Sequence, residues 1–376
     1  MTGVTVLGST GSIGRQTLEV LGGLRDRFEV GARGVGRRGD MLDSQLAAWP
    51  DARIWTDEAG PDPTTARWAD GGLEELATLD GVSLVVVATT GMAALPAVLA
   101  ALASGRRVAL ANKETLVTGG HLVARALDAL GGDPLERLRP IDSEHSAIWQ
   151  CLVGEQLADV ERLVLTASGG PFRGRAAQTL HRVTAEEALA HPTWRMGSKI
   201  TIDSATLVNK AFEVMEAKWL YRLAYSRIDA VIHPQSVVHS FVEFADGSYK
   251  AQLGLPDMRL PIQYAITYPD RLPSPARRSS PESWDSLEFA ELDRSAYPAY
   301  DAVRSAAEAG GNRGTILNAA DEVAVAAFLE DRIAFPSIAE TIDRAVERWG
   351  APTEPSLDEI TVLDADVRAA LTDELA

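Results

Sequence analysis

The chain has 376 residues, 46% of them hydrophobic, which is enough apolar material for two or three domains with buried cores. Lysine and arginine number 36 against 53 aspartates and glutamates, so the formal net charge is −17. Without a basic run, this acidic balance excludes nucleic acid as an expected partner, because phosphate backbones need clustered positive charge. An anionic substrate would need local cations or a metal ion at its site.

The cysteine content and the hydrophobic pattern indicate a cytoplasmic protein that does not span a membrane. A single cysteine, Cys151, excludes an intrachain disulfide and a cysteine zinc site and fits a reducing compartment. The first residues form a strand-like run without the basic segment of a secretory signal. The most apolar stretch, 82–103, is divided by Thr89-Thr90-Gly91 and contains Pro96. We interpret it as a buried strand followed by a helix and expect no membrane span.

Short β-branched runs alternate with longer amphipathic runs in the first third of the chain. We expect strands at 4–7, 28–35, 84–88 and 107–111, and helices at 13–21, 92–104 and 121–130. Strands that are apolar on both faces and alternate with helices predict a parallel sheet covered by helices. The fold class is therefore α/β, with an N-terminal Rossmann-like, nucleotide-binding domain over 1–133.

The pattern then becomes mixed and finally helical. Strand candidates at 162–167, 230–232, 237–244 and 249–253 and one long helix at 204–221 predict an α+β catalytic domain over 134–267. A proline-rich stretch predicts a linker over 268–294. Helical patterns at 298–309, 315–329, 336–349 and 364–375 predict a C-terminal helical bundle over 295–376.

A glycine-rich turn joins the first strand to the first helix. Gly8-Ser9-Thr10-Gly11-Ser12-Ile13-Gly14 follows the strand at 4–7 directly and opens the helix at Ile13. Glycines let the backbone approach a pyrophosphate, and a helix N-terminus supplies N–H groups and partial positive charge. The spacing is a variant of the usual dinucleotide fingerprint, and its place inside a βαβ pattern favours nucleotide binding over a plain glycine turn.

The end of the second strand indicates which nucleotide is bound. NAD-binding folds place a carboxylate there for the ribose 2′-hydroxyl, whereas this strand ends in Val35-Gly36-Arg37-Arg38, with Asp40 only afterwards. Two arginines favour a 2′-phosphate, so we expect NADPH; ordinary surface charge is the alternative interpretation. Asn112-Lys113-Glu114 follows the strand at 107–111 and is expected at the same carboxyl edge of the sheet.

Three carboxylates are candidates for a metal site. Asp142 and Glu144 are two residues apart, so an extended segment would point both in one direction. Glu213 lies on a predicted helix, where i,i+4 and i,i+3 spacing puts Asn209 and Lys210 on its face. Carboxylate ligands without cysteine favour Mg²⁺ or Mn²⁺. Acidic pairs are also common on solvated surfaces, so the spacing alone leaves both interpretations open.

Two segments could bind a phosphate group. Ser168-Gly169-Gly170 follows a predicted strand and can form a nest of backbone N–H groups. The helix predicted to begin near Ser204 offers an N-terminus, with Asn209 and Lys210 as further donors. A plain turn and a plain helix cap are equally good interpretations of the two segments.

Three histidines lie in segments of different character. The loop 191–197 carries His191 and, between Pro192 and Gly197, Trp194, which could be either a lid that excludes water or a plug of the core. His233 and His239 lie in or beside apolar strands, and we interpret them as core histidines.

Together these segments resemble the 1-deoxy-D-xylulose 5-phosphate reductoisomerases, NADPH-dependent enzymes of non-mevalonate isoprenoid biosynthesis. The matching stretches follow one another along nearly the whole chain, at 7–14, 109–116, 140–150, 166–172, 191–216, 233–240, 254–265 and 318–329. The resemblance is weak over 39–80 and through the proline linker.

The resemblance implies a role for each matching residue. The metal ligands would be Asp142, Glu144 and Glu213, which with Lys113 are the expected catalytic residues. The substrate would be held by Lys113, Ser143, Ser168, His191, Ser204, Asn209, Lys210 and Glu213. NADPH would contact Thr10, Gly11, Ser12, Ile13, Gly36, Arg37, Arg38, Asn112, Glu114 and Gly197. The loop 191–197 would close over the site with Trp194 as its cover, and Met258 would lie near the nicotinamide.

The resemblance also implies the chemistry. Mg²⁺ or Mn²⁺, chelated by the ketone and a hydroxyl of the sugar phosphate, would stabilise the negative charge that develops during rearrangement. Lys113 would add positive charge or move a proton. Retro-aldol cleavage and aldol rejoining would give an aldehyde, which NADPH reduces to 2-C-methyl-D-erythritol 4-phosphate. A homodimer is implied as well.

Two other functions remain as alternatives. A two-domain NADPH-dependent dehydrogenase, such as a semialdehyde dehydrogenase, would need a catalytic cysteine, and Cys151 has no activating partner in its sequence neighbourhood. A non-catalytic dinucleotide sensor would need neither the three carboxylates nor the phosphate-binding segments.

Overall fold

The computed structural model describes residues 1–36, 40–56, 71–194 and 196–376. The chain forms two compact units, each assembled from several segments. Unit 1 consists of Met1–Thr115, Leu122–Ser146 and Asp257–Arg277, and unit 2 of Leu116–His121, Ala147–Pro256 and Arg278–Ala376. The domain boundaries at 133, 267 and 294 stay a prediction. Among the described helices, none is both long and apolar enough to cross a membrane.

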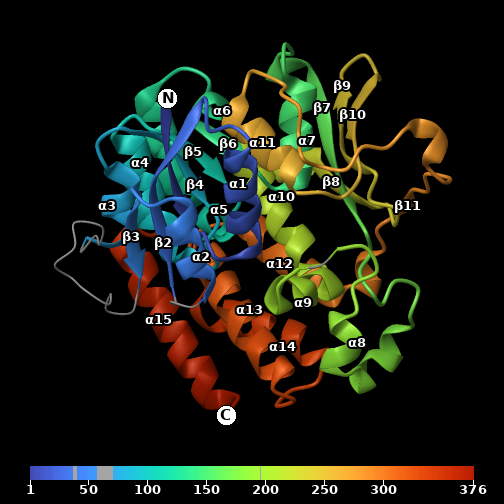
Figure 1. Ribbon diagram of the computed structural model, residues 1–376. Coiled ribbons are helices and arrows are strands. Elements are labelled where there is room, and N and C mark those ends of the chain that lie inside the picture. The colour runs from blue at the N-terminus through green and yellow to red at the C-terminus, as the bar shows by residue number, and fades with distance from the viewer. Residues whose placement is uncertain (37–39, 57–70, 195) are drawn as a thin grey trace. The chain divides into compact units, whose positions relative to one another are not determined.

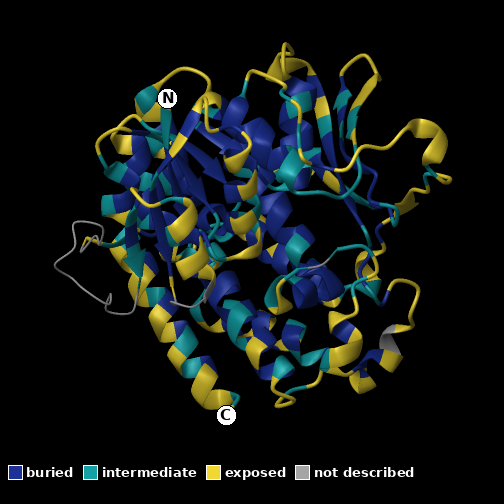
Figure 2. Ribbon diagram, in the orientation of Figure 1, coloured by how far each residue is buried: buried dark blue, intermediate teal, exposed yellow. Residues whose placement is uncertain are grey.

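Unit 1 is built on a six-stranded parallel sheet with the order β3-β2-β1-β4-β5-β6. Its strands are β1 (Thr2–Leu7), β2 (Phe28–Val35), β3 (Arg53–Thr56), β4 (Val82–Val87), β5 (Arg107–Leu110) and β6 (Leu138–Pro140). The central strands are buried on both faces, as Figure 2 shows. The order reverses between β1 and β4, and ligands of such sheets bind at the carboxyl side of this switch point.

Helices connect and cover these strands. They are α1 (Ser12–Gly22), α2 (Asp40–Ala48), α3 (Gly72–Thr78), α4 (Leu95–Ala103), α5 (Glu114–Leu130), α6 (Pro134–Arg137), α7 (Ser143–Leu152) and α11 (Arg259–Thr267), and α5 and α7 contribute residues to both units. Helix α1 packs beside α11, and α3 packs beside α4 (Figure 1). The Rossmann-like parallel sheet expected from the alternating pattern is confirmed.

Helix α5 is longer than its predicted extent of 121–130. It begins at Glu114 and continues through a kink at Gly119, where φ is −124° and ψ is 22°. The neighbouring Gly120 is required by packing, since a Cβ there would lie 2.3 Å from the Trp219 ring. The glycine pair therefore bends the helix without ending it.

Unit 2 contains a five-stranded mixed sheet with the order β10-β9-β7-β8-β11. The strands are β7 (Val160–Ala167), β8 (Ile228–Ile232), β9 (Val238–Phe244), β10 (Tyr249–Leu253) and β11 (Ala290–Glu291). Only β7 and β8 run parallel, and the other neighbouring pairs are antiparallel. Strand β11 lies within the predicted linker, so part of that linker is the short edge strand of this sheet.

The helices of unit 2 include the predicted C-terminal bundle. They are α8 (Ala185–Leu189), α9 (Ser198–Thr206), α10 (Val208–Tyr221), α12 (Pro298–Ala309), α13 (Arg313–Leu329), α14 (Ser337–Trp349) and α15 (Leu357–Glu374). Helix α10 packs against β7 and β8 on one side and against α12 on another. An apolar cluster that includes Phe212, Ile316, Phe328 and Ile342 fills the space between these helices.

The single helix predicted over 204–221 is wrong, because the structure has two helices there. Leu207 separates α9 from α10 with a left-handed backbone, at φ 59° and ψ 14°. Its side chain is buried in the apolar cluster, which offsets the cost of this conformation for a residue with a Cβ. Ser204 consequently lies near the carboxyl end of α9, and the expected helix N-terminus at Ser204 does not exist.

Candidate active site

The glycine loop after β1 lies at the switch point of the unit 1 sheet. Gly8 adopts a φ of +83°, and a Cβ there would lie 2.3 Å from the Ala88 carbonyl oxygen at the end of β4. A Cβ on Gly14 would lie 2.1 Å from the Gly8 carbonyl oxygen. Both positions therefore need glycine, the first for the turn and the other for the close packing of α1 on the loop.

The loop presents an open helix N-terminus. Gly11 is the N-cap of α1 and provides no side chain to bond the first N–H groups of the helix. Gly11 and Ser12 are exposed, and Thr10 and Ile13 are half-buried. The structure thus brings these four predicted cofactor residues together around N–H donors that suit a pyrophosphate. Gly36 is exposed directly after β2, while Arg37 and Arg38 lie outside the described residues.

Asn112, at the carboxyl end of β5, is committed to internal bonds. Its side-chain nitrogen donates to the carbonyl oxygens of Thr89 at 2.9 Å and Gly91 at 2.8 Å. Its side-chain oxygen accepts from the N–H of Thr115 at 2.8 Å and from the Thr115 hydroxyl. The amide therefore connects the segment after β4 to the start of α5. It also fixes the position of the chain at Lys113 and Glu114, directly after Asn112.

Lys113 and the acidic segment lie close together in unit 1. The Lys113 Nζ is 3.0 Å from the Asp142 Oδ2, and both side chains are largely buried. The Ser143 hydroxyl donates to the Glu144 Oε2 at 2.6 Å. The extended conformation expected for this segment is wrong, because Ser143 and Glu144 form the first turn of α7, directly after Asp142. The Asp142 carboxylate thus lies next to the Lys113 ammonium and directly before the N-terminus of α7, two groups that attract negative charge.

The Ser168 loop in unit 2 lies against the end of α9. Gly169 and Gly170 both have left-handed backbones, with φ of +86° and +67°. A Cβ on Gly170 would lie 2.6 Å from the Ser204 carbonyl oxygen, so glycine is needed for this approach. The predicted phosphate residues Ser168 and Ser204 are therefore brought onto neighbouring segments, although Ser204 contributes from a helix end other than the one expected.

His191 connects the Ser168 loop to the segment that follows it. Its Nε2 lies 3.1 Å from the Ser168 Oγ. Its Nδ1 lies 3.1 and 2.9 Å from the backbone N–H groups of Thr193 and Trp194, which must donate to it. An accepting Nδ1 means that the neutral ring carries its proton on Nε2, which then donates to Ser168. Burial lowers the pKa of His191 and favours this neutral form.

Glu213 is held by two neighbours on α10. Asn209 donates to its Oε1 and Lys210 to its Oε2, which confirms the predicted shared helix face. Lys210 and Glu213 are both buried, and a buried carboxylate is tolerated where a positive charge and hydrogen bonds accompany it. Unit 2 therefore presents a carboxylate whose oxygens have fixed directions.

Lys199, Asp203 and Asp321 form an ion cluster that the sequence analysis does not predict. The Lys199 Nζ lies 2.6 Å from the Asp203 Oδ2 on α9 and 2.7 Å from the Asp321 Oδ2 on α13. The same nitrogen lies 5.3 Å from the centre of the Phe212 ring on α10. Burial raises the pKa of Asp321. Lys199 and Asp203 are spaced i,i+4, which the sequence could have shown, whereas Asp321 is remote in the chain.

His233 and Cys151 are both buried, and their surroundings indicate structural roles. The His233 Nδ1 lies 2.8 Å from the Glu288 carbonyl oxygen, and its Nε2 lies 3.1 Å from the N–H groups of both Val237 and Val238. This bonding confirms a core histidine. Cys151 is buried, and burial raises its thiol pKa to about 11, so it is not an activated nucleophile. A cysteine-dependent dehydrogenase is thereby disfavoured.

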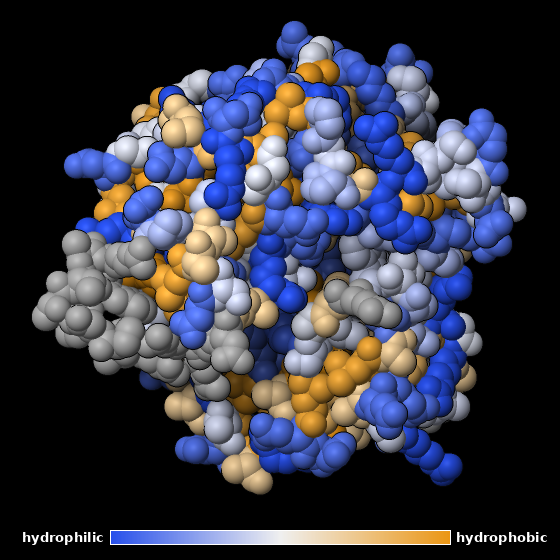
Figure 3. Space-filling view, viewed as in Figure 1, coloured by the Kyte–Doolittle hydropathy of each residue, from blue (hydrophilic) through white to orange (hydrophobic). Residues whose placement is uncertain are grey.

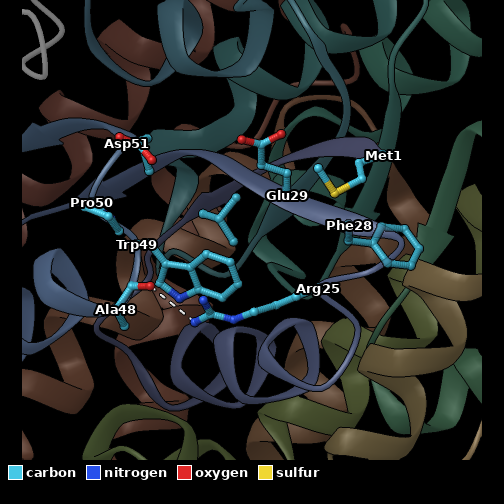
Figure 4. Close-up of a pocket in the computed structure, with 10 residues that line it drawn as sticks. Met1, Arg25, Phe28, Glu29, Ala48, Trp49, Pro50 and Asp51 are labelled. Atoms are coloured by element: carbon cyan, nitrogen blue, oxygen red, sulfur yellow. Dashed lines mark hydrogen bonds between the residues drawn. The ribbon is translucent and has the colours of Figure 1, made fainter.

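A cavity with a volume of about 310 Å³ lies elsewhere in unit 1. Residues at the starts of β1 and β2 and at the α2–β3 turn line it, and Figure 4 shows the Arg25 guanidinium over the Trp49 ring, 4.0 Å from its centre. It lies at the amino ends of the strands, whereas ligands of parallel sheets bind at the carboxyl ends.

Figure 3 shows mostly hydrophilic residues on the face in view, as expected for a strongly charged chain.

Comparison with known proteins gives one family over nearly the full length. The profile of 1-deoxy-D-xylulose 5-phosphate reductoisomerase matches residues 4–120, and the profiles of its C-terminal domains match 138–221 and 253–370. Proteins of that name from Pelotomaculum thermopropionicum and Bacillus subtilis are 48% and 43% identical, covering 97% and 98% of this chain and 96% and 98% of theirs.

Solved structures agree with this similarity. A DOX-P reductoisomerase crystallised with NADPH, fosmidomycin and magnesium superposes with a TM-score of 0.90 at 34% identity, covering 100% of this chain and 98% of that chain. The 1-deoxy-D-xylulose 5-phosphate reductoisomerase from Zymomonas mobilis in complex with NADPH gives 0.89 at 35% identity, with coverage of 100% and 99%.

Proposed function

The chain belongs to the 1-deoxy-D-xylulose 5-phosphate reductoisomerase family, and we propose that it converts this sugar phosphate to 2-C-methyl-D-erythritol 4-phosphate with NADPH and a divalent cation. The observation that carries the proposal is the full-length family match together with two buried lysine–carboxylate pairs, Lys113 with Asp142 and Lys210 with Glu213. A dinucleotide sensor would need neither pair.

Asp142, Glu144 and Glu213 would hold the cation, Mg²⁺ or Mn²⁺. The donor set fits a hard cation, since all three residues offer carboxylate oxygens and the chain has no cysteine cluster. When bound, the cation supplies positive charge to substrate oxygens on which negative charge develops. Lys113 lies beside Asp142 and Lys210 beside Glu213, while Ser143 donates to Glu144 and Asn209 to Glu213, which directs their oxygens.

The phosphate end of the substrate would be held within unit 2. Ser168 and Ser204 provide hydroxyl groups from adjacent segments, Lys210 provides a charge, and Asn209 provides an amide. His191, with its proton on Nε2, leaves the Ser168 hydroxyl free to direct its own proton toward the phosphate. The segment 191–197 acts as the lid in this proposal, with Trp194 as its cover, so that water is excluded during the reaction.

Lys113 would perform the proton chemistry near the reacting carbons. Its ammonium lies beside Asp142, one of the residues that would hold the cation. There it can hold developing negative charge or transfer a proton. Ser143 and Glu213 complete the proposed substrate contacts.

The cofactor would bind at the carboxyl edge of the unit 1 sheet. NADPH supplies the hydride for the reduction. The proposed contacts are the loop residues Thr10, Gly11, Ser12 and Ile13, then Gly36, Arg37 and Arg38 after β2, then Asn112 and Glu114 after β5, and Gly197 in the lid. Because the Asn112 side chain is fully committed, its contribution would come from its backbone.

An absorbance assay of NADPH oxidation tests the proposal. Turnover is expected when 1-deoxy-D-xylulose 5-phosphate and Mg²⁺ or Mn²⁺ are both present, and it should stop when a chelator is added and resume when excess cation is restored. Turnover that persists in the chelator would remove the cation from the proposal. No turnover with all components present would reject the assigned activity.

We further propose that the protein works as a cytoplasmic homodimer, as the family resemblance implies. The single buried cysteine fits a reducing compartment. Light scattering of the purified chain should give twice the monomer mass of 40.3 kDa, and a monomer at assay concentration would contradict the dimer.

A further inference from the structure

We infer that Gln45 on α2 is a positioning residue for the dinucleotide, because its carboxamide ties the inner side of the glycine loop to that helix. The Ser9 hydroxyl donates to the Gln45 Oε1 at 2.8 Å, and the Gln45 Nε2 donates to the Ser9 carbonyl oxygen at 2.8 Å. Both groups of the amide therefore bond one residue, and that residue lies inside the loop. This inference rests on the proposed NADPH-dependent function.

The two residues face the interior, away from the ligand side. Ser9 is 0% exposed and Gln45 is 8% exposed, whereas Gly11 and Ser12 are exposed. Buried amide groups lower stability when they lack hydrogen bonds, and here both the oxygen and the nitrogen of the Gln45 amide have a partner. Ser9 uses its hydroxyl and its carbonyl on Gln45, so it serves as the inward anchor of the loop and leaves the outward N–H groups to the ligand.

Two backbone hydrogen bonds to β2 hold the same part of the loop. The backbone N–H groups of Gly8 and Ser9 donate to the Gly34 carbonyl oxygen at 2.8 and 3.1 Å. Gly34 and Gln45 lie on either side of the segment that joins β2 to α2 in the sequence. The loop is thus held by both elements that flank this segment, and the Gln45 contact is the one made by a side chain.

Packing alone does not require glutamine at this place. Helix α2 already rests on the sheet through Leu42, which packs with Val35 and Ile54, with Leu46 beside them. A methionine of similar length would fill the volume of Gln45 and lose both hydrogen bonds. What the amide adds is a fixed direction for Ser9, and a preorganised loop binds its ligand with less loss of conformational freedom.

The test compares Gln45→Met with Gln263→Met in the full-length protein. Gln263 is a matched control, because it is also buried in unit 1 and its Nε2 also donates to backbone carbonyls, those of Leu272 at 2.8 Å and Pro273 at 3.1 Å. Equilibrium binding of NADPH is measured by quenching of tryptophan fluorescence, and thermal unfolding is measured without ligand. Ser9→Ala, which removes one of the two bonds, provides a milder variant.

We expect Gln45→Met to weaken NADPH binding about tenfold, which corresponds to about 1.4 kcal/mol. Ser9→Ala should weaken it less, and Gln263→Met should bind NADPH as the wild type does even where its unfolding temperature falls equally. Equal affinity of Gln45→Met and wild type would overturn the inference, as would an equal loss in Gln263→Met. If Gln45→Met does not fold, the affinity of Ser9→Ala decides in the same way. Failure of the wild-type protein to bind NADPH would instead reject the proposed function.

Discussion

Gly14→Ala should disturb both the stability of unit 1 and its binding of NADPH. In an ordinary helix position, replacing glycine with alanine stabilises the fold by about 1 kcal/mol. At Gly14 the new Cβ would lie 2.1 Å from the Gly8 carbonyl oxygen and 2.6 Å from the Ser9 Cα. These are backbone atoms that cannot rotate away, so α1 would have to move by about 1 Å to reach ordinary contact.

The magnitude follows from this displacement. Overpacking of this kind costs about 1 to 3 kcal/mol. Gly22→Ala is the matched control, because Gly22 is the last residue of the same helix and a Cβ there would have nothing within 4 Å. Relative to this control, Gly14→Ala should be less stable by about 2 to 4 kcal/mol, and each kcal/mol should lower the unfolding temperature by roughly 2 to 4 °C.

The cofactor measurement is independent of the stability measurement. A shift of α1 moves the N–H groups of Ser12 and Ile13, and losing one charged hydrogen bond costs about 1.5 to 3 kcal/mol, or roughly tenfold to a hundredfold in affinity. Circular dichroism during heating and NADPH titration of both variants provide the assay. If Gly14→Ala matched Gly22→Ala in both measurements, the tight approach of α1 to the glycine loop would be refuted.

Three further variants or conditions test the site. Glu213→Gln should nearly abolish turnover and also Mn²⁺ binding, which electron paramagnetic resonance measures, while NADPH affinity stays unchanged. The control is Glu340→Gln, at an exposed position on α14. A loss of NADPH affinity in Glu213→Gln would show that Glu213 does not belong to the metal site. Arg37→Glu should weaken NADPH far more than NADH, and an equal loss of both would refute a 2′-phosphate contact. Since the pKa of His191 is lowered from 6.5, its neutral form and its bonds to the lid are fully present above pH 6.5 and are lost as the pH falls through the lowered pKa. The KM for the sugar phosphate should therefore rise in acid, and a KM that stays constant or falls there would contradict the proposed ring state.

The parallel sheet and the glycine loop could be predicted because local features specify them. The alternation of apolar strands and helices needs only neighbouring residues to be recognised, and the loop between β1 and α1 carries its glycines at the positions where the backbone requires them. The shared face of Asn209, Lys210 and Glu213 was predictable for the same reason, since helical spacing alone places them together.

The break between α9 and α10 could not be predicted from local signals. Glycine or asparagine usually marks a left-handed helix end, whereas here the residue is Leu207, which the buried core holds in place. At Leu207, tertiary packing therefore determines the local conformation. The extended segment expected at Asp142 is wrong for a different reason, because two-residue spacing alone does not show that a helix begins at Ser143.

Contacts between remote parts of the chain could not be predicted either. Asp321 meets Lys199, and Gln45 meets Ser9, only after several elements have folded together. The segment around α2, β3 and α3 was the least informative part of the sequence, because β3 has only four residues and its strand signal is short. Long-range partners of this kind need either a structure or covarying positions from many relatives.

The segmented composition of unit 1 has a consequence for biosynthesis. Its last segment, Asp257–Arg277, includes α11, which packs beside α1 from the beginning of the chain. Residue 277 must therefore have left the ribosome before unit 1 can fold completely. A truncated chain that ends after the first segment would expose the apolar side of α1. Nascent chains of increasing length should become resistant to protease only once α11 has emerged from the exit tunnel.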